Sequence, residues 1–358
     1  MSDPEVRIDQ LTGLRTLLAP SRADRPFEFE VAPPPTEQRG APGREAEEVP
    51  PDSCPFCEGH EDQTPPEVWA DRPTGSAPNG SGWRVRAVPN LYPALVATPE
   101  ARATGEGGLS ASPDPLLASA RSGEPELFAT APASGAHEVI VHTPSHRRSL
   151  AELGAEQLEA AVAGWRARMR AHGDAGYVQL IVNEGPDAGA SLEHTHAQLY
   201  ALSFVPAAVA RERERFIAHH EHTMGGDLLA DVAAEEVRRR ERLVAIDDET
   251  LLVCPWASRS PFELRIVPRR AEPRFEADDE IGAAMLSTAL RALSERFGSA
   301  PQLNLWVRTA PRHAERFHWH IDISPQLTIR AGFELSTGVE INVYAPERAA
   351  SELREALG

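Results

Sequence analysis

Apolar and polar residues alternate in several short runs of this chain, and a period of two is typical of strands with one buried face. In the first half, such runs occupy 137–143, 177–184 and 192–202. Between the first two runs, a helix at about 149–172 has its apolar positions at Leu150, Leu153, Leu158, Val162 and Trp165. The first half is therefore expected to combine strands with at least one amphipathic helix.

The second half repeats this order. Its expected strands are 242–246, 250–257, 262–270, 303–309 and 317–325, with a helix at about 279–297. Residues 137–146 match 262–271, and the pair His194/His196 stands opposite His318/His320. One supersecondary unit used twice is the simplest account. We therefore predict an α+β protein with an N-terminal half at 1–205 and a C-terminal half at 206–358.

Two stretches break the periodic pattern. Residues 33–53 are rich in proline, glycine and charge, which is typical of a loop. Residues 97–135 are rich in alanine, serine, glycine, proline and acidic residues, and we expect a mobile insertion there.

Composition limits the classes of function. The chain has 358 residues and a net charge of −18, so it is a poor candidate for binding nucleic acid or an anionic membrane. No residue is lysine, which leaves arginine, histidine and backbone N–H groups to hold any phosphate. The three cysteines do not form a disulfide scaffold, and no apolar run approaches the roughly 20 residues of a membrane span. The first ten residues lack the apolar stretch of a signal peptide, and we expect a cytoplasmic protein.

The first candidate for chemistry is the segment from His194 to Gln198, which reads His-Thr-His-Ala-Gln. On a strand, residues two apart share a face, so His194, His196 and Gln198 would line the same side. Three polar side chains on one face need partners if they are buried. An exposed polar strand face is the alternative.

The second candidate is Cys54-Pro-Phe-Cys57, whose two thiolates could share one metal ion. A redox dithiol is the alternative, but the proline-rich and acidic flanks do not suggest a strand followed by a helix. Two cysteines and two histidines complete a tetrahedral zinc site. His146 and His194 are the candidates for the two histidine ligands.

A third candidate is the loop from Asn183 to Ser191, where glycines would let backbone N–H groups approach an anion. Arg22 and Arg25 could supply fixed donors to a diphosphate. Surface arginines in contact with water are the alternative reading of this pair.

Taken together, four ordered motifs resemble the galactose-1-phosphate uridylyltransferase family of the histidine-triad superfamily. They are the Cys-Pro-Phe-Cys segment, the segment PNLYPAL that begins at residue 89, the segment HEVIVHTPSH that begins at residue 137, and Asn-x-Gly-x-x-x-Gly-Ala-Ser-x-x-His-x-His-x-Gln from residue 183. The run from Phe317 to Gly338 resembles the second half of the same family. The resemblance implies two histidine-triad-like halves, in agreement with the repeat seen in the pattern.

The resemblance also implies roles for individual residues. One structural zinc ion per chain would be held by Cys54, Cys57, His146 and His194. His196 would attack the α-phosphorus of a nucleotide and form a nucleotidyl-histidine. Gln198 would steady the phosphoryl oxygens, Asn183 and Ser191 would contact phosphate, Arg22 and Arg25 would be the N-terminal arginines, and Asn90 would lie in the nucleoside pocket.

The implied reaction moves UMP between UDP-glucose and galactose 1-phosphate, and the implied assembly is a homodimer. The same nucleophile would serve an ADP-sugar phosphorylase with inorganic phosphate as acceptor, or a nucleotide hydrolase. A catalytically inactive nucleotide-binding protein is a further alternative, and the intact His-Thr-His-Ala-Gln segment argues against it. The chain departs from the family at Thr195, where proline is frequent, and at Glu184, where lysine is frequent. It also lacks the second cysteine pair that some members carry.

Overall fold

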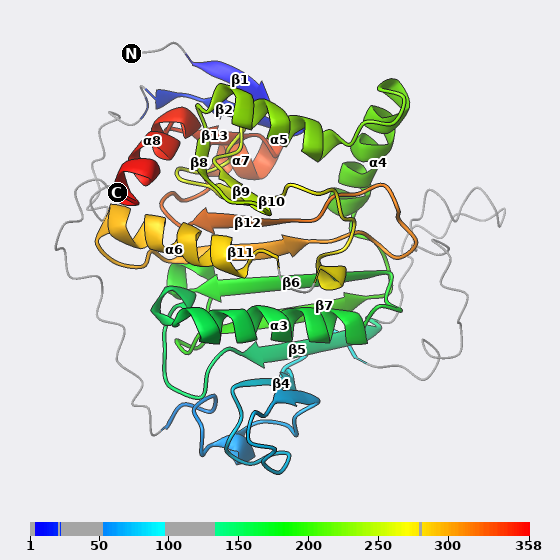
Figure 1. Ribbon diagram of the computed structural model, residues 1–358, viewed down its shortest axis with the longest axis vertical. Coiled ribbons are helices and arrows are strands. Elements are labelled where there is room, and N and C mark those ends of the chain that lie inside the picture. Colours follow the sequence, from blue (N-terminus) through cyan, green and yellow to red (C-terminus); the bar gives the residue numbers. More distant parts are fainter. Residues whose placement is uncertain (1–3, 21, 23–52, 97–132, 279–280) are drawn as a thin grey trace.

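The computed structural model describes residues 4–20, 22, 53–96, 133–278 and 281–358 (Figure 1). The expected loop at 33–53 and the expected insertion at 97–135 lie outside this part of the chain, except for 53 and 133–135 at their ends. No helix among the described residues is long and apolar enough to cross a membrane.

Ten antiparallel strands form one sheet that carries both halves of the chain. In spatial order they are β3 (Trp69–Asp71), β4 (Val85–Pro89), β5 (Gly135–Val141), β7 (His196–Leu202), β6 (Tyr177–Glu184), β11 (Leu303–Arg308), β12 (His320–Pro325), β10 (Leu264–Pro268), β9 (Thr250–Val253) and β8 (Leu243–Ile246). The halves meet where β6 pairs with β11, and Asn183 lies opposite Asn304 at that seam. Because the ten strands are continuous, the division at residue 205 stays a prediction.

Two long helices cover one face of this sheet (Figure 1). Helix α3 (Ala155–Ala171) packs against the first half and α6 (Ala283–Phe297) against the second. Their apolar stripes and the strand residues beneath them form the main core, which includes Trp165, Leu199 and Leu305. The alternation of the strands therefore leaves His196, Gln198 and their neighbours on the opposite face.

The opposite face is covered differently in the two halves. Over the second half, α4 (Ala207–His222) and α5 (Leu228–Arg239) enclose a smaller core around Phe216 and Phe317. Over the first half, the segment that contains Cys54 and Cys57 packs with Trp83, Val139 and Val141. This contrast gives the two halves different chemistry on equivalent strands.

The remaining elements join the two ends of the chain. A three-stranded sheet contains β1 (Glu5–Ile8), β2 (Arg15–Leu18) and β13 (Glu340–Asn342), with β2 and β13 parallel. Helices α7 (Gly332–Thr337) and α8 (Pro346–Ala356) flank β13 in sequence. Four short 3₁₀ turns complete the described structure: η3 (Glu61–Gln63), η4 (Leu150–Glu152), η5 (Pro186–Ala188) and η6 (Phe275–Ala277).

The α+β class and the repeated halves predicted from the sequence are confirmed, and the strand expected at 177–184 has the predicted bounds. The strand expected at 192–202 begins only at His196. Residues 192–194 are not extended there, because Thr195 N–H donates to Arg147 O (2.7 Å) and His194 turns toward the two cysteines. The helix expected at 149–172 is similarly divided into η4 and α3.

Hydrogen bonds show the internal repeat in detail. His194 Nε2–H donates to the carbonyl of Thr143, and His318 Nε2–H donates to the carbonyl of Pro268, each at 2.9 Å. His196 and His320 each use Nδ1 to bond the carbonyl of the histidine two residues earlier. Corresponding residues thus make corresponding bonds in both halves.

Candidate active site and metal centre

Cys54, Cys57, His146 and His194 come from three separate segments and meet beside the start of β7. One ligand atom from each lies within 4.8 Å of the others. His194 Nδ1 is 3.6 Å from Cys54 Sγ and 3.7 Å from Cys57 Sγ, and His146 Nδ1 is 3.5 Å from Cys57 Sγ. In the part of the chain that the structure describes, this is the one such group of potential metal ligands.

The donor set is prepared for a cation. Because His194 Nε2–H is bonded to Thr143 O, the lone pair of Nδ1 is directed at the two sulfurs. Burial and the neighbouring Cys54 raise the pKa of Cys57 to about 12, so the two thiols would not both ionise without a positive charge between them. These residues fit a structural metal ion.

His196, two residues after His194, has the opposite tautomer. Its Nδ1–H donates to the carbonyl of His194 at 2.7 Å, which leaves the lone pair on Nε2. Burial lowers the pKa of His196, so the ring is neutral at pH 7. Phe56, between the two cysteines, packs edge-on against this ring with centroids 5.2 Å apart. The segment from Cys54 to Cys57, called the metal loop below, thus helps to hold a neutral imidazole whose Nε2 is available.

Gln198 lies two residues after His196 on the same face of β7, and its side-chain carbonyl oxygen already accepts hydrogen bonds. Tyr200 Oη–H donates to Gln198 Oε1 at 2.9 Å. His137 Nδ1 accepts from the backbone N–H of Ala94, so its Nε2–H donates to the same Oε1 at 3.0 Å. The amide nitrogen of Gln198 is therefore the end of that side chain left to donate to a ligand.

Comparison with known proteins agrees with this constellation. The sequence profile described as galactose-1-phosphate uridyl transferase, N-terminal domain, matches residues 109–206. The chain is similar to the galactose-1-phosphate uridylyltransferase family, both in this segment and in relatives that match nearly its whole length. A galactose-1-phosphate uridylyltransferase of Cryptococcus neoformans var. neoformans is 27% identical over 98% of this chain and 90% of its own length. An ADP-glucose phosphorylase of Arabidopsis thaliana is 29% identical over 98% and 93%, respectively.

Solved structures show the same fold. An ADP-glucose phosphorylase from Arabidopsis thaliana with bound ADP-glucose gives a TM-score of 0.76 at 24% identity and covers 99% of both chains. A uridylyltransferase structure gives a TM-score of 0.68, also at 24% identity. The curated relatives that are similar to this chain support a nucleotidyltransferase of this family.

The other residues that the family resemblance indicated differ in how close they lie to His196 and Gln198. Asn183 follows Val182, the last residue of β6 that pairs with β7, where Val182 is opposite Ala197; Asn183 therefore lies near His196. Asn90 Nδ2 is 3.1 Å from His137 Nε2, which places Asn90 next to the Gln198 cluster. Ser191 is exposed in the loop before β7. Arg22 is exposed just after β2, and Arg25 lies outside the described residues.

The loop after β6 is fixed by the second half of the chain. Gly185 and Gly189 have φ of 89° and 84°, a region that favours glycine. Gln302 accepts from Asp187 N–H at 2.6 Å and donates to the Asp187 carboxylate at 3.0 Å. Asn304 Nδ2 bonds both Asn183 Oδ1 and Ala188 O at 2.8 Å. The C-terminal half therefore shapes the loop that the sequence indicates as a candidate anion site.

Glu184, where the resembled family frequently has lysine, does not place a negative charge on the face of the sheet that carries His196 and Gln198. Its side chain is buried, because it follows Asn183 and alternation directs it to the other face of the sheet. It accepts from Ser149 Oγ and Leu150 N–H, each at 2.6 Å, and from Thr195 Oγ1 at 2.9 Å. Burial raises the pKa of Glu184, while these three donors favour the charged carboxylate.

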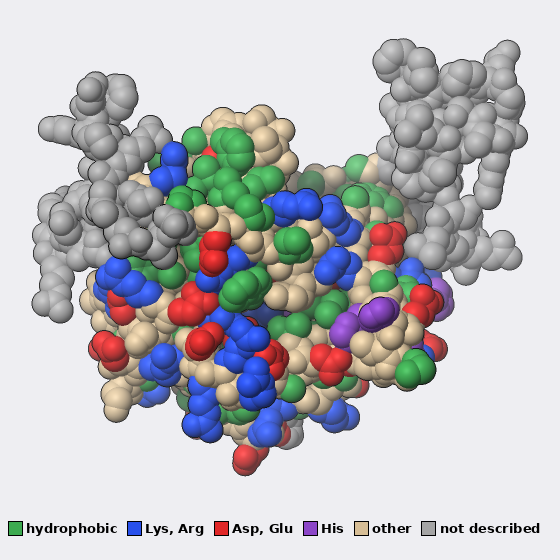
Figure 2. Space-filling model, turned by 90° about the horizontal axis from the view of Figure 1, so that it is seen from above, with side chains coloured by type: hydrophobic (Ala, Val, Ile, Leu, Met, Phe, Trp, Pro, Cys, Tyr) green, Lys and Arg blue, Asp and Glu red, His purple; other side chains and the backbone are tan. Residues whose placement is uncertain are grey.

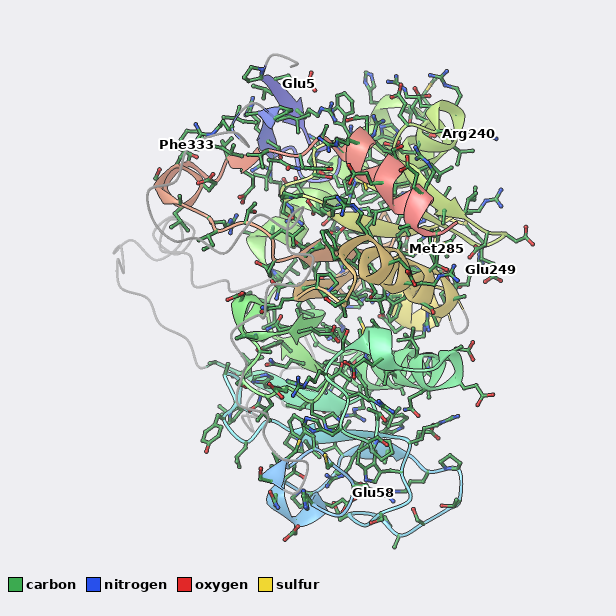
Figure 3. The ribbon with its side chains drawn as sticks, turned by 90° about the vertical axis from the view of Figure 1, so that its left-hand side faces the viewer. Glu5, Glu58, Arg240, Glu249, Met285 and Phe333 are labelled. Atoms are coloured by element: carbon green, nitrogen blue, oxygen red, sulfur yellow. The ribbon has the colours of Figure 1, made fainter. Side chains whose placement is uncertain are left out.

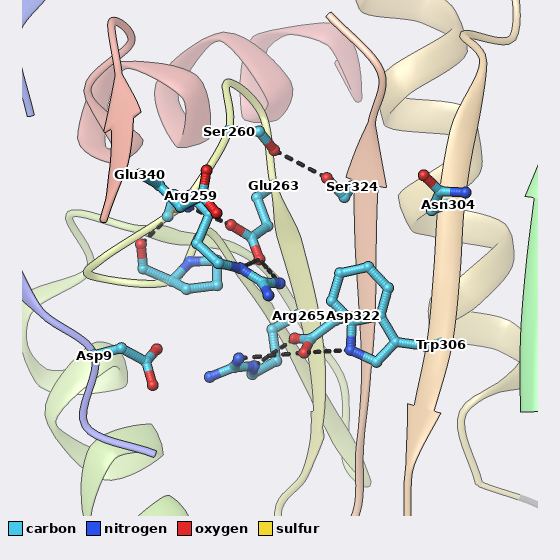
Figure 4. Close-up of polar contacts among 12 residues, drawn as sticks. Asp9, Arg259, Ser260, Glu263, Arg265, Asn304, Trp306, Asp322, Ser324 and Glu340 are labelled. Carbon is cyan, nitrogen blue, oxygen red and sulfur yellow. Dashed lines mark hydrogen bonds and ion pairs between the residues drawn. The ribbon is translucent and has the colours of Figure 1, made fainter. Parts of the chain in front are cut away.

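Among the residues that the structure describes, the second half carries the same strands without a comparable site (Figure 4). Asp322 stands where the repeat places Gln198, and it accepts from Arg265 Nε at 2.6 Å and from Trp306 Nε1–H at 3.0 Å. His320, the counterpart of His196, is covered by α4, with Glu212 Oε1 3.4 Å from its Nε2. Buried ion pairs and a covering helix have therefore taken the place of an accessible nitrogen and amide.

Three residues of the site were not expected from the sequence: His137, Tyr200 and Phe56. The signal for the first two was present, since Tyr200 continues the alternation of His196 and Gln198, and His137 begins an adjacent predicted strand. Their meeting at Gln198 depends on the register of β5 against β7, where His137 is opposite Tyr200. Phe56 could be singled out only once the metal loop was placed against β7.

Proposed function

We propose that this protein transfers UMP between UDP-glucose and a hexose 1-phosphate, galactose 1-phosphate, through a covalent nucleotidyl-His196 intermediate. The observation that carries the proposal is the hydrogen bond from His196 Nδ1–H to His194 O. It fixes the ring and leaves the Nε2 lone pair on the face of β7 that α3 does not cover. A neutral imidazole is a good nucleophile at pH 7.

In the first step, the Nε2 lone pair of His196 forms a bond to the α-phosphorus of the nucleotide sugar. The bond from that phosphorus to the bridging oxygen breaks, and the sugar 1-phosphate leaves with the bond's electron pair. In the second step, a phosphate oxygen of the acceptor attacks the same phosphorus and the N–P bond breaks. Gln198 Nε2 would donate to the phosphoryl oxygens, where charge develops. Arg22 and Arg25, Asn183 and Ser191 are proposed as phosphate contacts, and Asn90 as a nucleoside contact.

We assign the metal site to one zinc ion. With Zn–S near 2.3 Å and Zn–N near 2.0–2.1 Å, tetrahedral ligands should have S···N separations of about 3.6 Å. The three measured Sγ···Nδ1 distances, 3.5, 3.6 and 3.7 Å, agree with this value. Zinc held by His194 would fix the segment that presents His196, which is a positioning role.

A second candidate uses the same intermediate with adenine and inorganic phosphate. It is favoured by the 29% identity to the ADP-glucose phosphorylase of Arabidopsis thaliana over 98% of this chain. The homodimer and the cytoplasmic location stay predictions.

One experiment tests the mechanism and separates the two candidates. The protein is incubated with UDP-glucose or ADP-glucose alone and analysed by intact-protein mass spectrometry. We expect an acid-labile adduct and release of sugar 1-phosphate up to one equivalent, and the added mass identifies UMP or AMP. Galactose 1-phosphate or inorganic phosphate is then added to discharge the adduct. Turnover only with donor and acceptor together, without any adduct, would contradict the covalent mechanism.

A further inference from the structure

Beneath the start of β7, on the face covered by α3, a chain of buried polar side chains ends at Glu184. Trp165 Nε1–H donates to His142 Nε2 at 2.9 Å, and His142 Nδ1 is 3.0 Å from Thr195 Oγ1. Thr195 Oγ1 is 2.9 Å from Glu184 Oε1. All four side chains are buried.

Each hydrogen bond in this series of side chains has a fixed donor and a fixed acceptor. The indole N–H can only donate, so His142 Nε2 accepts and His142 Nδ1–H must donate to Thr195 Oγ1. The Thr195 hydroxyl therefore donates its own hydrogen to Glu184. Only a residue that both donates and accepts at position 195 satisfies His142 and Glu184 together, and a buried polar group without a partner is costly.

Thr195 is also the residue between the metal ligand and the nucleophile. Its backbone N–H donates to Arg147 O at 2.7 Å, and its carbonyl accepts from His142 N–H at 3.4 Å. The carbonyl that holds His196 Nδ1 belongs to His194, one peptide earlier. Rotation of the backbone at Thr195 would therefore move His196 relative to the carbonyl that fixes its ring.

We propose that Thr195 and Glu184 are positioning residues for the nucleophilic step, a role that rests on the proposed function. The carboxylate of Glu184 connects the hydroxyl between the two histidines to the N-terminus of η4, through Ser149 Oγ and Leu150 N–H. Thr195 and Glu184, the two departures from the family pattern, are thus joined by a hydrogen bond. Together they hold the backbone that presents His196 Nε2.

The second half offers a matched control. Thr309 is equally buried, and its Oγ1–H donates to Glu276 Oε2 at 2.7 Å while accepting from Phe275 N–H at 3.2 Å. This bond has the same chemistry and burial but lies in the half without the proposed nucleophile. Loss of either hydroxyl should disturb packing to a similar extent, and only loss of Thr195 should disturb the chemistry.

The test compares Thr195→Val, Thr195→Ser and Thr309→Val in the full chain, with Glu184→Gln as a second probe of the pair. Single-turnover adduct formation is measured against nucleotide-sugar concentration, together with metal content and thermal unfolding. Thr195→Val should slow the adduct step at saturating donor by about 10- to 100-fold, with little change in the donor concentration for half-maximal rate. Thr195→Ser should restore the rate, Glu184→Gln should also slow it, and Thr309→Val should react as the wild type does.

The proposal is overturned if Thr195→Val, folded and loaded with metal, forms the adduct at the wild-type rate. It is also overturned if Thr309→Val is slowed as much as Thr195→Val, since that would show a general effect on the fold. If Thr195→Val fails to fold, an unchanged adduct rate in Glu184→Gln overturns it. A wild-type protein that forms no adduct would instead overturn the proposed function, and this role with it.

Discussion

His194 and His196 are two residues apart, yet they form hydrogen bonds to the backbone through different ring nitrogens. His194 donates from Nε2 to Thr143 O and directs Nδ1 at the cysteines. His196 donates from Nδ1 to His194 O and leaves Nε2 available. A carbonyl oxygen can only accept, so each bond fixes the tautomer. One ring is therefore suited to bind a metal and the other to attack phosphorus.

Substitution of the two histidines should consequently have different effects. His196→Ala should lower adduct formation by on the order of 1000-fold or more while the metal content stays at the wild-type level, because the substituted ring is not a ligand. His194→Ala should lose metal and unfold at a lower temperature. Intact mass, metal analysis and thermal unfolding measure the three properties. Retention of the adduct in a folded His196→Ala protein would exclude this residue as the nucleophile.

At the scale of elements, the equivalent strands β7 and β12 are packed against different segments. The His196 end of β7 is packed by the metal loop, whereas β12 is covered by α4 and α5. Glu212 on α4 and His320 on β12 are both buried, with their Oε1 and Nε2 atoms 3.4 Å apart. Burial raises the pKa of Glu212 to about 7 and lowers the pKa of His320 to about 3, so the folded protein favours a neutral pair.

This pair predicts opposite pH dependences for two variants. In Glu212→Gln, the remaining His320 has a pKa of about 3 when folded and 6.5 when unfolded, so stability present above pH 6.5 is lost as the pH falls. In His320→Gln, the remaining Glu212 has a pKa of about 7 when folded and 4.5 when unfolded, so stability present below pH 4.5 is lost as the pH rises. In the wild type, the folded and unfolded pairs each hold one proton between about pH 4.5 and 6.5, and the effects cancel.

Chemical unfolding at a series of pH values checks this prediction. Relative to the wild type, each variant should show a slope of about 1.4 kcal/mol per pH unit in this range, with opposite signs. Glu214→Gln, at an exposed position of the same helix, serves as the control. Parallel curves for all four proteins would contradict the neutral pair.

At the scale of the whole molecule, charge is interspersed and the metal site lies toward one end. In the view of Figure 2, the basic side chains gather in more than one group, and acidic side chains lie next to them. In Figure 3, Glu58, next to Cys57, lies at the opposite end of the structure from Glu5 and Phe333. The segment around Cys54 and Cys57 contains little regular structure, so its attachment to the sheet depends on the metal ligands and on the small core around Trp83.

We therefore expect one metal equivalent per chain and a coupling of the metal to folding. The double variant Cys54→Ala with Cys57→Ala should lose the metal and unfold at a lower temperature, by about 1 °C for each kcal/mol lost. Cys254→Ala is the control, because Cys254 is a fully buried thiol of the main core and should not affect the metal content. About two metal equivalents, or metal retained in the double variant, would contradict this assignment.

The sequence by itself determined the strand and helix classes, the repeat of the two halves and the grouping of His196 with Gln198. These follow from local periodicity, since neighbours along a strand or helix set which face a side chain occupies. It also indicated the four potential metal ligands, through the spacing of the cysteines and the family motifs.

Only the tertiary structure decided which nitrogen of each histidine is available, that His137 meets Gln198, and that Glu184 lies beneath Thr195, away from the face that carries His196 and Gln198. Each of these depends on contacts between residues distant in sequence, such as the register of β5 against β7 and the closure of the 149–152 turn onto β6. Periodicity assigns a side chain to a face, but its partners there depend on sheet pairing and chain closure, which no local pattern encodes.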